Sequence, residues 1–494
     1  MADAVSVRHP RVLAYLFFAE AWERFSYYGM KALLVLYLTK SLSFGDKTAY
    51  AIYGSYTALV YTTPVLGGLL ADRLLGFRKA VVLGGVLMAL GHFAMAVQNL
   101  QVFYFALGLL ICGNGFFKPN ISSIVGRLYG PDDPRRDSAF TIFYMGINLG
   151  GLLSPLVCGY LGERFGWHWG FGLAGVGMLL GLVVFLRAQP LLAGLADPPP
   201  RRAGAAAALL GFSAETWLYL GALLGVVAAW QLEQHAALVG TLLIVFGAVV
   251  LLGLIAYLLR LPDKVGRERL AVALLLTLVS VVFWSFFEQT GTSMSLFTDR
   301  NVDRSLFGWQ IPTSQFQSVN SLFILLFAPG FGALWLYLAR RKREPNTPLK
   351  FGLGILQLGL GFIALYVGAN VSRATGVVPM FWLVLGYFLH STGELCLSPI
   401  GLSMITKLSP PSITGIMMGT WFFASAFAQY AASLIAQLTG VRDGGALASA
   451  LPKPADTVMV YGSVFGSIGW VALGVGALVV LVSPLIARRM HGVH

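Results

Sequence analysis

Long apolar segments recur along the whole chain, and short polar stretches separate them. A helix of about 20 mostly apolar residues spans the hydrocarbon core of a bilayer, and the chain contains fourteen such segments. Their approximate bounds are 13–38, 49–71, 79–97, 101–124, 138–161, 168–187, 214–231, 237–259, 269–297, 313–338, 351–370, 378–407, 413–437 and 458–486. Because the connecting stretches are short, the pattern predicts an all-α integral membrane protein with fourteen transmembrane helices.

One stretch divides the series of helices. The Pro-Pro-Pro-Arg-Arg run at 198–202 cannot continue a helix, and six predicted helices precede it. Two helices follow, and then six more. We therefore expect four parts: a six-helix bundle at 1–187, a cytoplasmic linker at 188–213, a two-helix insert at 214–259 and a second six-helix bundle at 260–494. Two six-helix halves are similar to the major facilitator fold, which binds substrate near the bilayer midplane.

Composition supports the membrane assignment and excludes other classes. The chain of 494 residues is 57% hydrophobic and 11% charged, less than half of the roughly 25% charged residues of a soluble domain. Its net charge of +13 reflects 21 acidic against 34 basic residues, with no compact basic domain for a nucleic acid. The three cysteines lie in apolar segments, so neither a disulfide framework nor a metal site is expected.

The basic residues between the helices are distributed unequally. With the N-terminus in the cytoplasm, 23 of the 34 Lys and Arg residues fall on the cytoplasmic side and 8 on the other. Cytoplasmic loops carry the excess of Lys and Arg, so both termini are predicted to be cytoplasmic. The segment 68–79 between the second and third helices has Gly, Asp-Arg, Gly and a final Arg-Lys pair, and it resembles the major facilitator loop signature.

The first helix contains charged residues that do not suit a lipid-facing position. A charge at a helix centre costs about 2.5–3.5 kcal/mol on insertion scales. At 100° per residue, six polar or charged positions lie within about 140° of arc, so this face must contact protein or water. These residues are Glu20, Glu23, Arg24, Tyr27, Tyr28 and Lys31. Glu20 and Arg24 are also spaced to pair on the helix; a purely structural ion network is the alternative.

The other interior charges divide unequally between the two halves. The cations Arg24, Lys31 and Lys118 all lie in the first half, whereas Glu288 and Glu394 are the isolated charges of the second. A cavity between the halves would then be positive on one wall and negative on the other. A zwitterion with separated ends, such as a short peptide, suits that distribution. Five further residues are candidates for binding or for plain packing: Tyr61, Asn148, Trp284, Asn320 and Trp421.

Three segments together resemble one transporter family. The Glu-x-x-Glu-Arg-Phe-x-Tyr-Tyr-Gly sequence at 20–29 resembles the first-helix signature of the proton-dependent oligopeptide transporter family, within the major facilitator superfamily. The sequences Phe-Tyr-x-x-Ile-Asn-x-Gly at 143–150 and Gly-Glu-Leu-Cys-Leu-Ser-Pro at 393–399 resemble its fifth-helix and tenth-helix signatures. The insert is typical of bacterial members, and the short 371–377 loop leaves no room for the extracellular domain of animal members.

The resemblance implies roles that the physics alone does not assign. Arg24 and Lys118 would bind the peptide carboxylate, and Glu394 would bind its amino terminus with Asn148 and Asn320. The side-chain pockets would be lined by aromatic residues: Tyr28, Tyr61, Trp284 and Trp421. Proton coupling would involve a second set: Glu20, Glu23, Arg24 and Glu288.

The resemblance also implies two gates of opposite charges. Lys31 with Glu288 would close the outer side, and Lys118 with Glu394 would close the inner side. Position 31 is lysine, where many relatives are expected to have arginine. Lysine keeps the charge but lacks the bidentate fork, so this gate is expected to be weaker or differently tuned.

We therefore expect a proton-coupled symporter that imports di- and tripeptides by alternating access, in the bacterial inner membrane and as a monomer. Its partners would be peptides, protons and the lipid bilayer, with no nucleic acid and no cofactor other than the proton. A nitrate, drug or other small-anion carrier on the same scaffold is the alternative. An enzyme is not expected, because no grouping of His, Asp and Glu has the spacing of a catalytic site. A channel would differ by lacking saturable, gradient-driven uptake.

Overall fold

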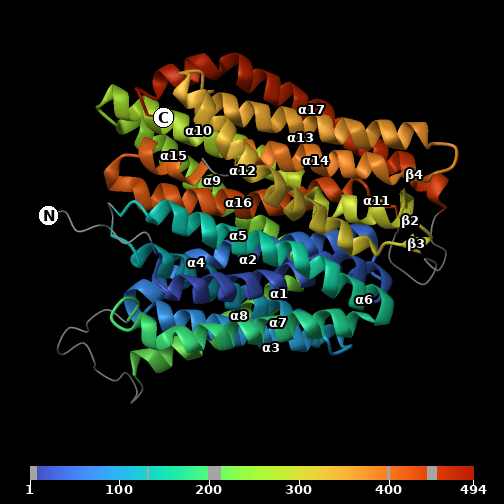
Figure 1. Cartoon of the computed structure of the whole chain (residues 1–494), viewed down its shortest axis with the longest axis horizontal. Helices are drawn as coiled ribbons and strands as arrows, with labels where there is room; N and C mark the ends of the chain where they lie inside the picture. The colour runs from blue at the N-terminus through green and yellow to red at the C-terminus, as the bar shows by residue number, and fades with distance from the viewer. Residues whose placement is uncertain (1–7, 131–132, 198–212, 398–400, 442–452, 494) are drawn as a thin grey trace. The chain divides into compact units, whose positions relative to one another are not determined.

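The computed structural model describes residues 8–130, 133–197, 213–397, 401–441 and 453–493 (Figure 1). Within these residues, helices form at all fourteen predicted places. The α-helices are α1 (Val12–Lys40), α2 (Asp46–Leu70), α3 (Phe77–Met95), α4 (Leu100–Arg127), α5 (Arg136–Ser154), α6 (Tyr160–Phe165), α7 (Trp167–Ala188), α8 (Ala214–Glu233), α9 (Ala236–Arg260), α10 (Lys264–Phe287), α11 (Ser293–Asn301), α12 (Ser318–Arg340), α13 (Thr347–Val371), α14 (Met380–Leu397), α15 (Gly401–Leu408), α16 (Thr414–Gln437) and α17 (Pro454–Arg489).

Most of these helices can span a membrane by themselves. Among the described residues, eleven helical segments are long and apolar enough to cross a bilayer. The first helix does not meet that composition limit, since α1 carries four charged residues in its interior. The prediction of a multi-pass, predominantly helical membrane protein is confirmed.

Short irregular elements connect or interrupt the helices. Four two-residue strands form two small ladders: β1 (Val302–Asp303) with β4 (Val378–Pro379), and β2 (Ser305–Leu306) with β3 (Trp309–Gln310). Two π-helical turns and four 3-10 turns complete the described structure: η1 (Ala71–Leu75), η2 (Pro155–Gly159), η3 (Gln189–Leu192), η4 (Glu288–Gly291), η5 (Thr313–Gln317) and η6 (Pro411–Ile413).

Three predicted spans are interrupted. The span 138–161 becomes α5, η2 and α6, because Pro155 has no N–H to donate to the preceding turn. The span 269–297 becomes α10, η4 and α11, and its irregular turn begins at Glu288. The span 378–407 comprises α14 and α15, and residues 398–400 of the tenth-helix signature lie outside the described residues, as does the 198–202 run of the linker.

Contacts group the helices into two units. Unit 1 comprises Met1–Leu33 and Leu59–His235, and unit 2 comprises Leu34–Ala58 and Ala236–His494. The division passes through α1 and α2, and it assigns the two helices of the predicted insert to different units. The predicted bundle limits at 187 and 260 stay a prediction.

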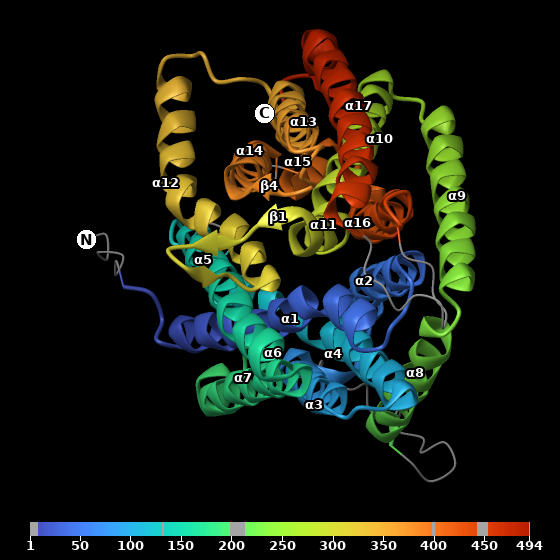
Figure 2. The same cartoon turned by 90° about the vertical axis from the view of Figure 1, so that its right-hand side faces the viewer.

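Glycines allow helices to pack closely inside each unit. In unit 1, a Cβ at Gly108 of α4 would lie 2.8 Å from the carbonyl oxygen of Val226 in α8, and Figure 2 shows α8 beside α4. In unit 2, α13 packs against both α14 and α17. A Cβ at Gly393 would lie 2.7 Å from the carbonyl oxygen of Gly354 in α13, which explains the glycine in the tenth-helix signature.

Candidate functional site

The charged face of α1 is buried within the protein. Glu20, Glu23 and Arg24 are at most 1% exposed, and Lys31 is 7% exposed. The prediction that this face avoids lipid is confirmed. Burying these groups without partners would be prohibitive, so the contacts among them decide what the cluster can do.

Arg24 forms its strongest contacts with its neighbour in sequence. Its Nη2 donates to Glu23 Oε1 at 2.5 Å, and its Nε donates to Glu23 Oε2. The Nε also lies 3.4 Å from Glu20 Oε1, which confirms the predicted pair with Glu20. The i,i+4 spacing on the helix favoured Glu20 as the partner of Arg24. The guanidinium group instead contacts both carboxylate oxygens of Glu23, and such bidentate pairs are stronger and more specific in geometry. Glu20 Oε2 has no hydrogen-bond partner among the described residues.

Two further contacts fix the Arg24–Glu23 pair. Asn114 of α4 donates from Nδ2 to Glu23 Oε1 at 3.3 Å, a contact that the sequence did not reveal. The guanidinium carbon of Arg24 also lies 5.1 Å and 5.9 Å from the ring centroids of Tyr27 and Tyr28. Aromatic faces attract cations at such distances, so Tyr28 contacts the charge cluster itself.

The fifth-helix signature has a steric explanation at Arg24. A Cβ at Gly150 of α5 would lie 2.9 Å from both Arg24 Cβ and the backbone nitrogen of Phe25. Glycine therefore allows α5 to pack directly against the charged turn of α1. Asn148, 8% exposed, donates from Nδ2 to the carbonyl oxygen of Tyr144 at 3.1 Å. Its donor is thus directed to its own helix, and its side-chain carbonyl is the group suited to accept from a ligand.

Lys118 provides a second cation in unit 1. Its Nζ lies 4.9 Å from the ring centroid of Tyr61, so the predicted pocket residue Tyr61 contacts the predicted carboxylate-binding residue. The charges of Glu20, Glu23 and Arg24 all act on Lys118. Unit 1 therefore brings together six predicted site residues, which include both cations that were assigned to the peptide carboxylate: Glu20, Glu23, Arg24, Tyr28, Tyr61 and Lys118.

Glu394 of unit 2 has a different kind of environment. Asn320 of α12 donates from Nδ2 to Glu394 Oε2 at 3.1 Å and lies 3.0 Å from Ser391 Oγ. Ser391 in turn donates to the carbonyl oxygen of Tyr387 at 2.7 Å. Among the described residues Glu394 forms no ion pair, and the nearby charge that acts on it is another carboxylate, Glu288. Among the described residues, the hydrogen-bond partner of Glu394 is therefore a neutral amide.

The remaining predicted residues of unit 2 lie in aromatic or irregular surroundings. The Trp284 ring packs edge-on against Phe287, with centroids 5.2 Å apart. A Cβ at Gly401 of α15 would lie 2.5 Å from the Trp421 ring, so Trp421 packs on α15. Glu288 is 7% exposed and begins the 3-10 turn η4. The two gate pairs each combine residues of different units, and they stay predictions.

One buried ion cluster was missed by the sequence analysis. Arg300 of α11 donates from Nη1 and Nη2 to the two carboxylate oxygens of Asp46, both at 2.7 Å, and from Nη1 to Tyr461 Oη at 2.9 Å. The backbone N–H of Val441 also donates to Asp46 at 3.0 Å. Asp46 begins α2 and resembles an ordinary helix-terminus residue in the sequence, so the pattern gave no signal for this contact. The cluster joins residues 34–58 to the helices of unit 2.

The chain is similar to known membrane transporters over nearly its whole length. A model of the POT family matches residues 78–449. A Bacillus subtilis relative, described as the uncharacterized transporter YclF, is 40% identical over 98% of this chain and 96% of its own length. This chain belongs to the POT family.

Other members of the POT family share its full length and its fold. Dipeptide and tripeptide permease B of Shigella dysenteriae is 33% identical over 98% of this chain and 97% of its own length. A crystal structure of a POT peptide transporter in complex with sulfate is 38% identical, covers 98% of this chain and 96% of its own, and has a TM-score of 0.81. These relatives are transporters, and the major facilitator fold is confirmed. Among the described residues, no group of three or more His, Cys, Asp or Glu side chains could hold a metal ion.

Proposed function

We propose that this protein imports di- and tripeptides together with protons. One observation carries the proposal: the buried Arg24 and the half-buried Lys118 provide two cations in unit 1, and the half-buried carboxylate Glu394 of unit 2 has a neutral hydrogen-bond partner. A peptide carries one carboxylate and one ammonium at separated ends, so each end finds a group of opposite charge. Membership of the POT family supports the same substrate class. So does a relative that is described as a dipeptide and tripeptide permease.

Each end of the peptide would change the ion pairs of the unit that binds it. We propose that the carboxylate competes with Glu23 for Arg24 and with the Tyr61 ring for Lys118. The ammonium would bind Glu394 and the side-chain carbonyls of Asn320 and Asn148, which can rotate to accept. Aromatic rings tolerate side chains of many shapes, and four of them would line the side-chain pockets: Tyr28, Tyr61, Trp284 and Trp421.

Proton coupling would follow from competition among buried carboxylates. A carboxylate is stabilised in its charged form by a nearby cation and in its neutral form by burial. When a cation leaves, the carboxylate therefore takes up a proton. We propose that Glu20, Glu23 and Glu288 act in this way as Arg24 and Lys31 change partners. The pairs Lys31–Glu288 and Lys118–Glu394 would form and break as the outer and inner gates.

The placement in the membrane follows from the charge of the loops. With 23 basic residues on one side and 8 on the other, we propose that both termini are cytoplasmic and that the protein resides in the bacterial inner membrane. It would act as a monomer and need no cofactor besides the proton. We retain the division into bundles 1–187 and 260–494 as the proposed moving parts.

Uptake by liposomes that contain the purified protein tests this function. An inward proton gradient should drive accumulation of labelled dialanine, and unlabelled di- and tripeptides should compete. An ionophore that collapses the gradient should leave only equilibration. If dialanine is not taken up while nitrate or a drug is accumulated, the protein is a carrier of the alternative class.

A further inference from the structure

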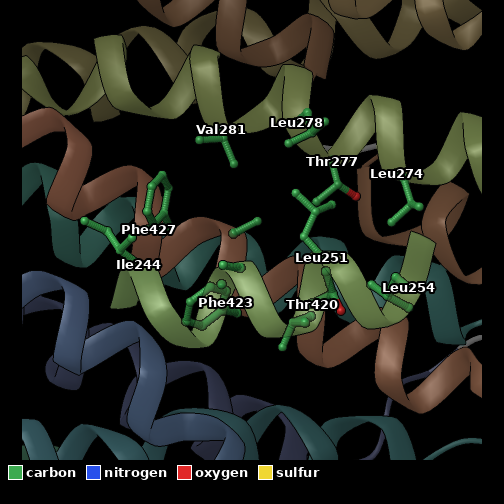
Figure 3. A pocket seen from close by; sticks show the side chains of 14 residues that line it. Ile244, Leu251, Leu254, Leu274, Thr277, Leu278, Val281, Thr420, Phe423 and Phe427 are labelled. Atoms are coloured by element: carbon green, nitrogen blue, oxygen red, sulfur yellow. The ribbon is translucent and has the colours of Figure 1, made fainter. Parts of the chain in front are cut away.

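An apolar crevice lies on unit 2, away from the residues assigned to peptide and proton. It has a volume of about 230 Å³ and lies between α9, α10 and α16. Figure 3 shows Ile244 and Phe427 at one end and Leu254 and Leu274 at the other. Its helix α9 is the second helix of the insert, and Figure 2 shows this helix at the rim of unit 2. The transport mechanism gives this crevice no role.

The way α9 is attached explains why the crevice is open. Near one end, the rings of Phe246 and Phe423 lie 4.9 Å apart. Near the other end, Tyr257 Oη and Ser412 Oγ are 3.0 Å apart and form a hydrogen bond. Between these two attachments α9 presents the small residues Gly247 and Ala248 to the crevice. A Cβ at Gly247 would lie 3.0 Å from the Phe423 ring, so this glycine allows the ring to pack on α9, while Ala248 contributes only a methyl group to the lining.

The walls of the crevice suit a hydrocarbon chain. Its two hydroxyl groups already donate to their own helices: Thr277 Oγ1 to the carbonyl oxygen of Ala273 at 2.8 Å, and Thr420 Oγ1 to that of Ile416 at 2.9 Å. All other lining residues are apolar. A peptide or another polar ligand would leave its own donors without partners there, at a cost that a hydrocarbon chain avoids.

The length of the crevice matches one leaflet of a bilayer. Ile244 and Leu254 are ten residues apart on α9, which corresponds to about 15 Å along the helix. The hydrocarbon core of a bilayer is about 30 Å thick. The crevice is therefore as deep as a single layer of acyl chains.

Basic residues lie beyond the Leu254 end. Arg260, Lys264 and Arg267 are all exposed, and Arg260 is about 9 Å farther along the helix than Leu254, at the depth of lipid headgroups. The two nearest acidic residues are Asp263 and Glu268, and both have hydrogen-bond partners. Asp263 accepts from the backbone N–H groups of Val265 and Gly266.

The second acidic residue, Glu268, has a partner as well. Its Oε2 lies 2.7 Å from His491 Nε2. The three basic side chains therefore remain available to an anion. Lys and Arg near a membrane surface attract anionic lipids, and the positive-inside count places this end at the cytoplasmic leaflet.

We propose that the crevice binds one anionic phospholipid of the cytoplasmic leaflet. One acyl chain lies between α9, α10 and α16, and the phosphate binds Arg260 and Arg267. The insert helix α9 thus forms one wall of a lipid site. This inference depends on the proposed orientation in the membrane, and it does not depend on the identity of the transported substrate.

Native mass spectrometry of the full-length protein tests the proposal. The protein is exchanged into micelles with equal amounts of dioleoyl phosphatidylglycerol and dioleoyl phosphatidylcholine. Wild type should retain one phosphatidylglycerol with a preference of about tenfold over phosphatidylcholine. Ala248→Trp fills the crevice and should abolish this retention. Val249→Trp is the matched control, because Val249 is 63% exposed on the same helix and does not line the crevice.

A second pair of variants tests binding of the lipid headgroup without altering the lining of the crevice. The double variant Arg260→Gln/Arg267→Gln should lose the preference for phosphatidylglycerol, whereas Arg187→Gln, an exposed arginine of unit 1, should keep it. Equal retention in wild type and Ala248→Trp, with Ala248→Trp still active in dialanine uptake, would overturn the proposal. The proposal would also be overturned if the double variant preferred phosphatidylglycerol as strongly as wild type does. Two further outcomes would contradict it: retention of oleate in place of a phospholipid, and a dimer of the protein that Ala248→Trp alone dissociates.

Discussion

Two carboxylate sites, the buried Glu23 of unit 1 and the half-buried Glu394 of unit 2, differ in how their charge is balanced. Glu23 of unit 1 accepts from both the guanidinium of Arg24 and the amide of Asn114. Glu394 of unit 2 accepts from the amide of Asn320 and forms no ion pair among the described residues. Among the described contacts, the carboxylate of the first site is paired with a cation, whereas that of the second accepts from a neutral amide. In the proposed mechanism, Glu23 is the counter-ion that releases Arg24 to the peptide carboxylate, and Glu394 receives the peptide ammonium.

This difference has an energetic basis. Removing one partner of a buried ion pair typically costs about 3–5 kcal/mol, because the other charge is left uncompensated. A hydrogen bond to a charged group contributes about 1.5–3 kcal/mol. Substitutions in unit 1 should therefore affect folding and transport together, whereas substitutions at Glu394 should affect ligand binding far more than stability.

The largest expected effect is that of Arg24→Ala. It removes the cation that pairs directly with the buried Glu20 and Glu23, so we expect a loss of about 3–5 kcal/mol in stability and no dialanine uptake or exchange. Thermal unfolding in detergent and liposome uptake measure the two effects. Arg24→Lys is the matched control: it keeps the charge, loses the bidentate contact, and should retain more stability than transport. Normal uptake by Arg24→Ala would contradict the role of Arg24.

Glu394→Gln should separate binding from folding. The amide preserves the hydrogen bond with Asn320 in a flipped orientation, so stability should change by less than about 1 kcal/mol. The affinity for dialanine should fall by about 10- to 100-fold, since a charged hydrogen bond to the ammonium is lost. Equilibrium binding and thermal unfolding of the same sample provide both values. A large loss of stability with unchanged affinity would show that Glu394 is a structural residue.

Glu288→Gln tests whether a carboxylate outside both ligand contacts couples the proton. Without its titratable group, gradient-driven accumulation should be lost by more than about tenfold, while counterflow exchange of dialanine across equal concentrations persists. Uptake in the presence and absence of the gradient separates the two modes. Loss of both modes in folded protein would mean that Glu288 also binds the peptide.

The smallest effect is expected at a half-buried carboxylate–arginine pair in the loop before α5. Arg135 donates to both oxygens of Asp133, at 3.0 and 2.8 Å, which lowers the pKa of Asp133 to about 2. This value lies below the ordinary 3.9 of an unfolded chain, so its contribution is present above about pH 4 and is lost as the pH falls through about 2. Asp133→Asn should therefore leave the pH dependence of uptake between pH 5 and 8 unchanged. A shift of the profile would show that this loop takes part in proton coupling.

The sequence predicted the features that depend on local patterns. Apolar length predicted the helices, and the 3.6-residue period placed the charges of α1 on one buried face. The sequence contained a signal for the break at Pro155, namely the proline itself, but the prediction of a single span at 138–161 did not use it. The break at Glu288 was not predicted; in this turn a Cβ at Gly291 would clash with the hydroxyl oxygen of Tyr53, a contact within unit 2 that one sequence does not reveal.

Contacts between distant segments could not be predicted from one sequence. The spacing on α1 favoured Glu20 as the partner of Arg24, whereas side-chain geometry selects Glu23. Asn114 and Ser391 resemble ordinary polar residues of a helix until their partners are known. The Asp46–Arg300 pair joins residues 254 positions apart, and only the folded chain brings them together.

The central claim is that each end of the peptide binds a different unit. The most direct test measures the affinity of wild type, Lys118→Gln and Glu394→Gln for dialanine, for its C-terminal amide and for its N-acetyl derivative. We predict that Lys118→Gln loses only the preference for a free carboxylate, and that Glu394→Gln loses only the preference for a free ammonium. If both variants lose both preferences equally, or if neither loses any, the division of roles between the two units is wrong.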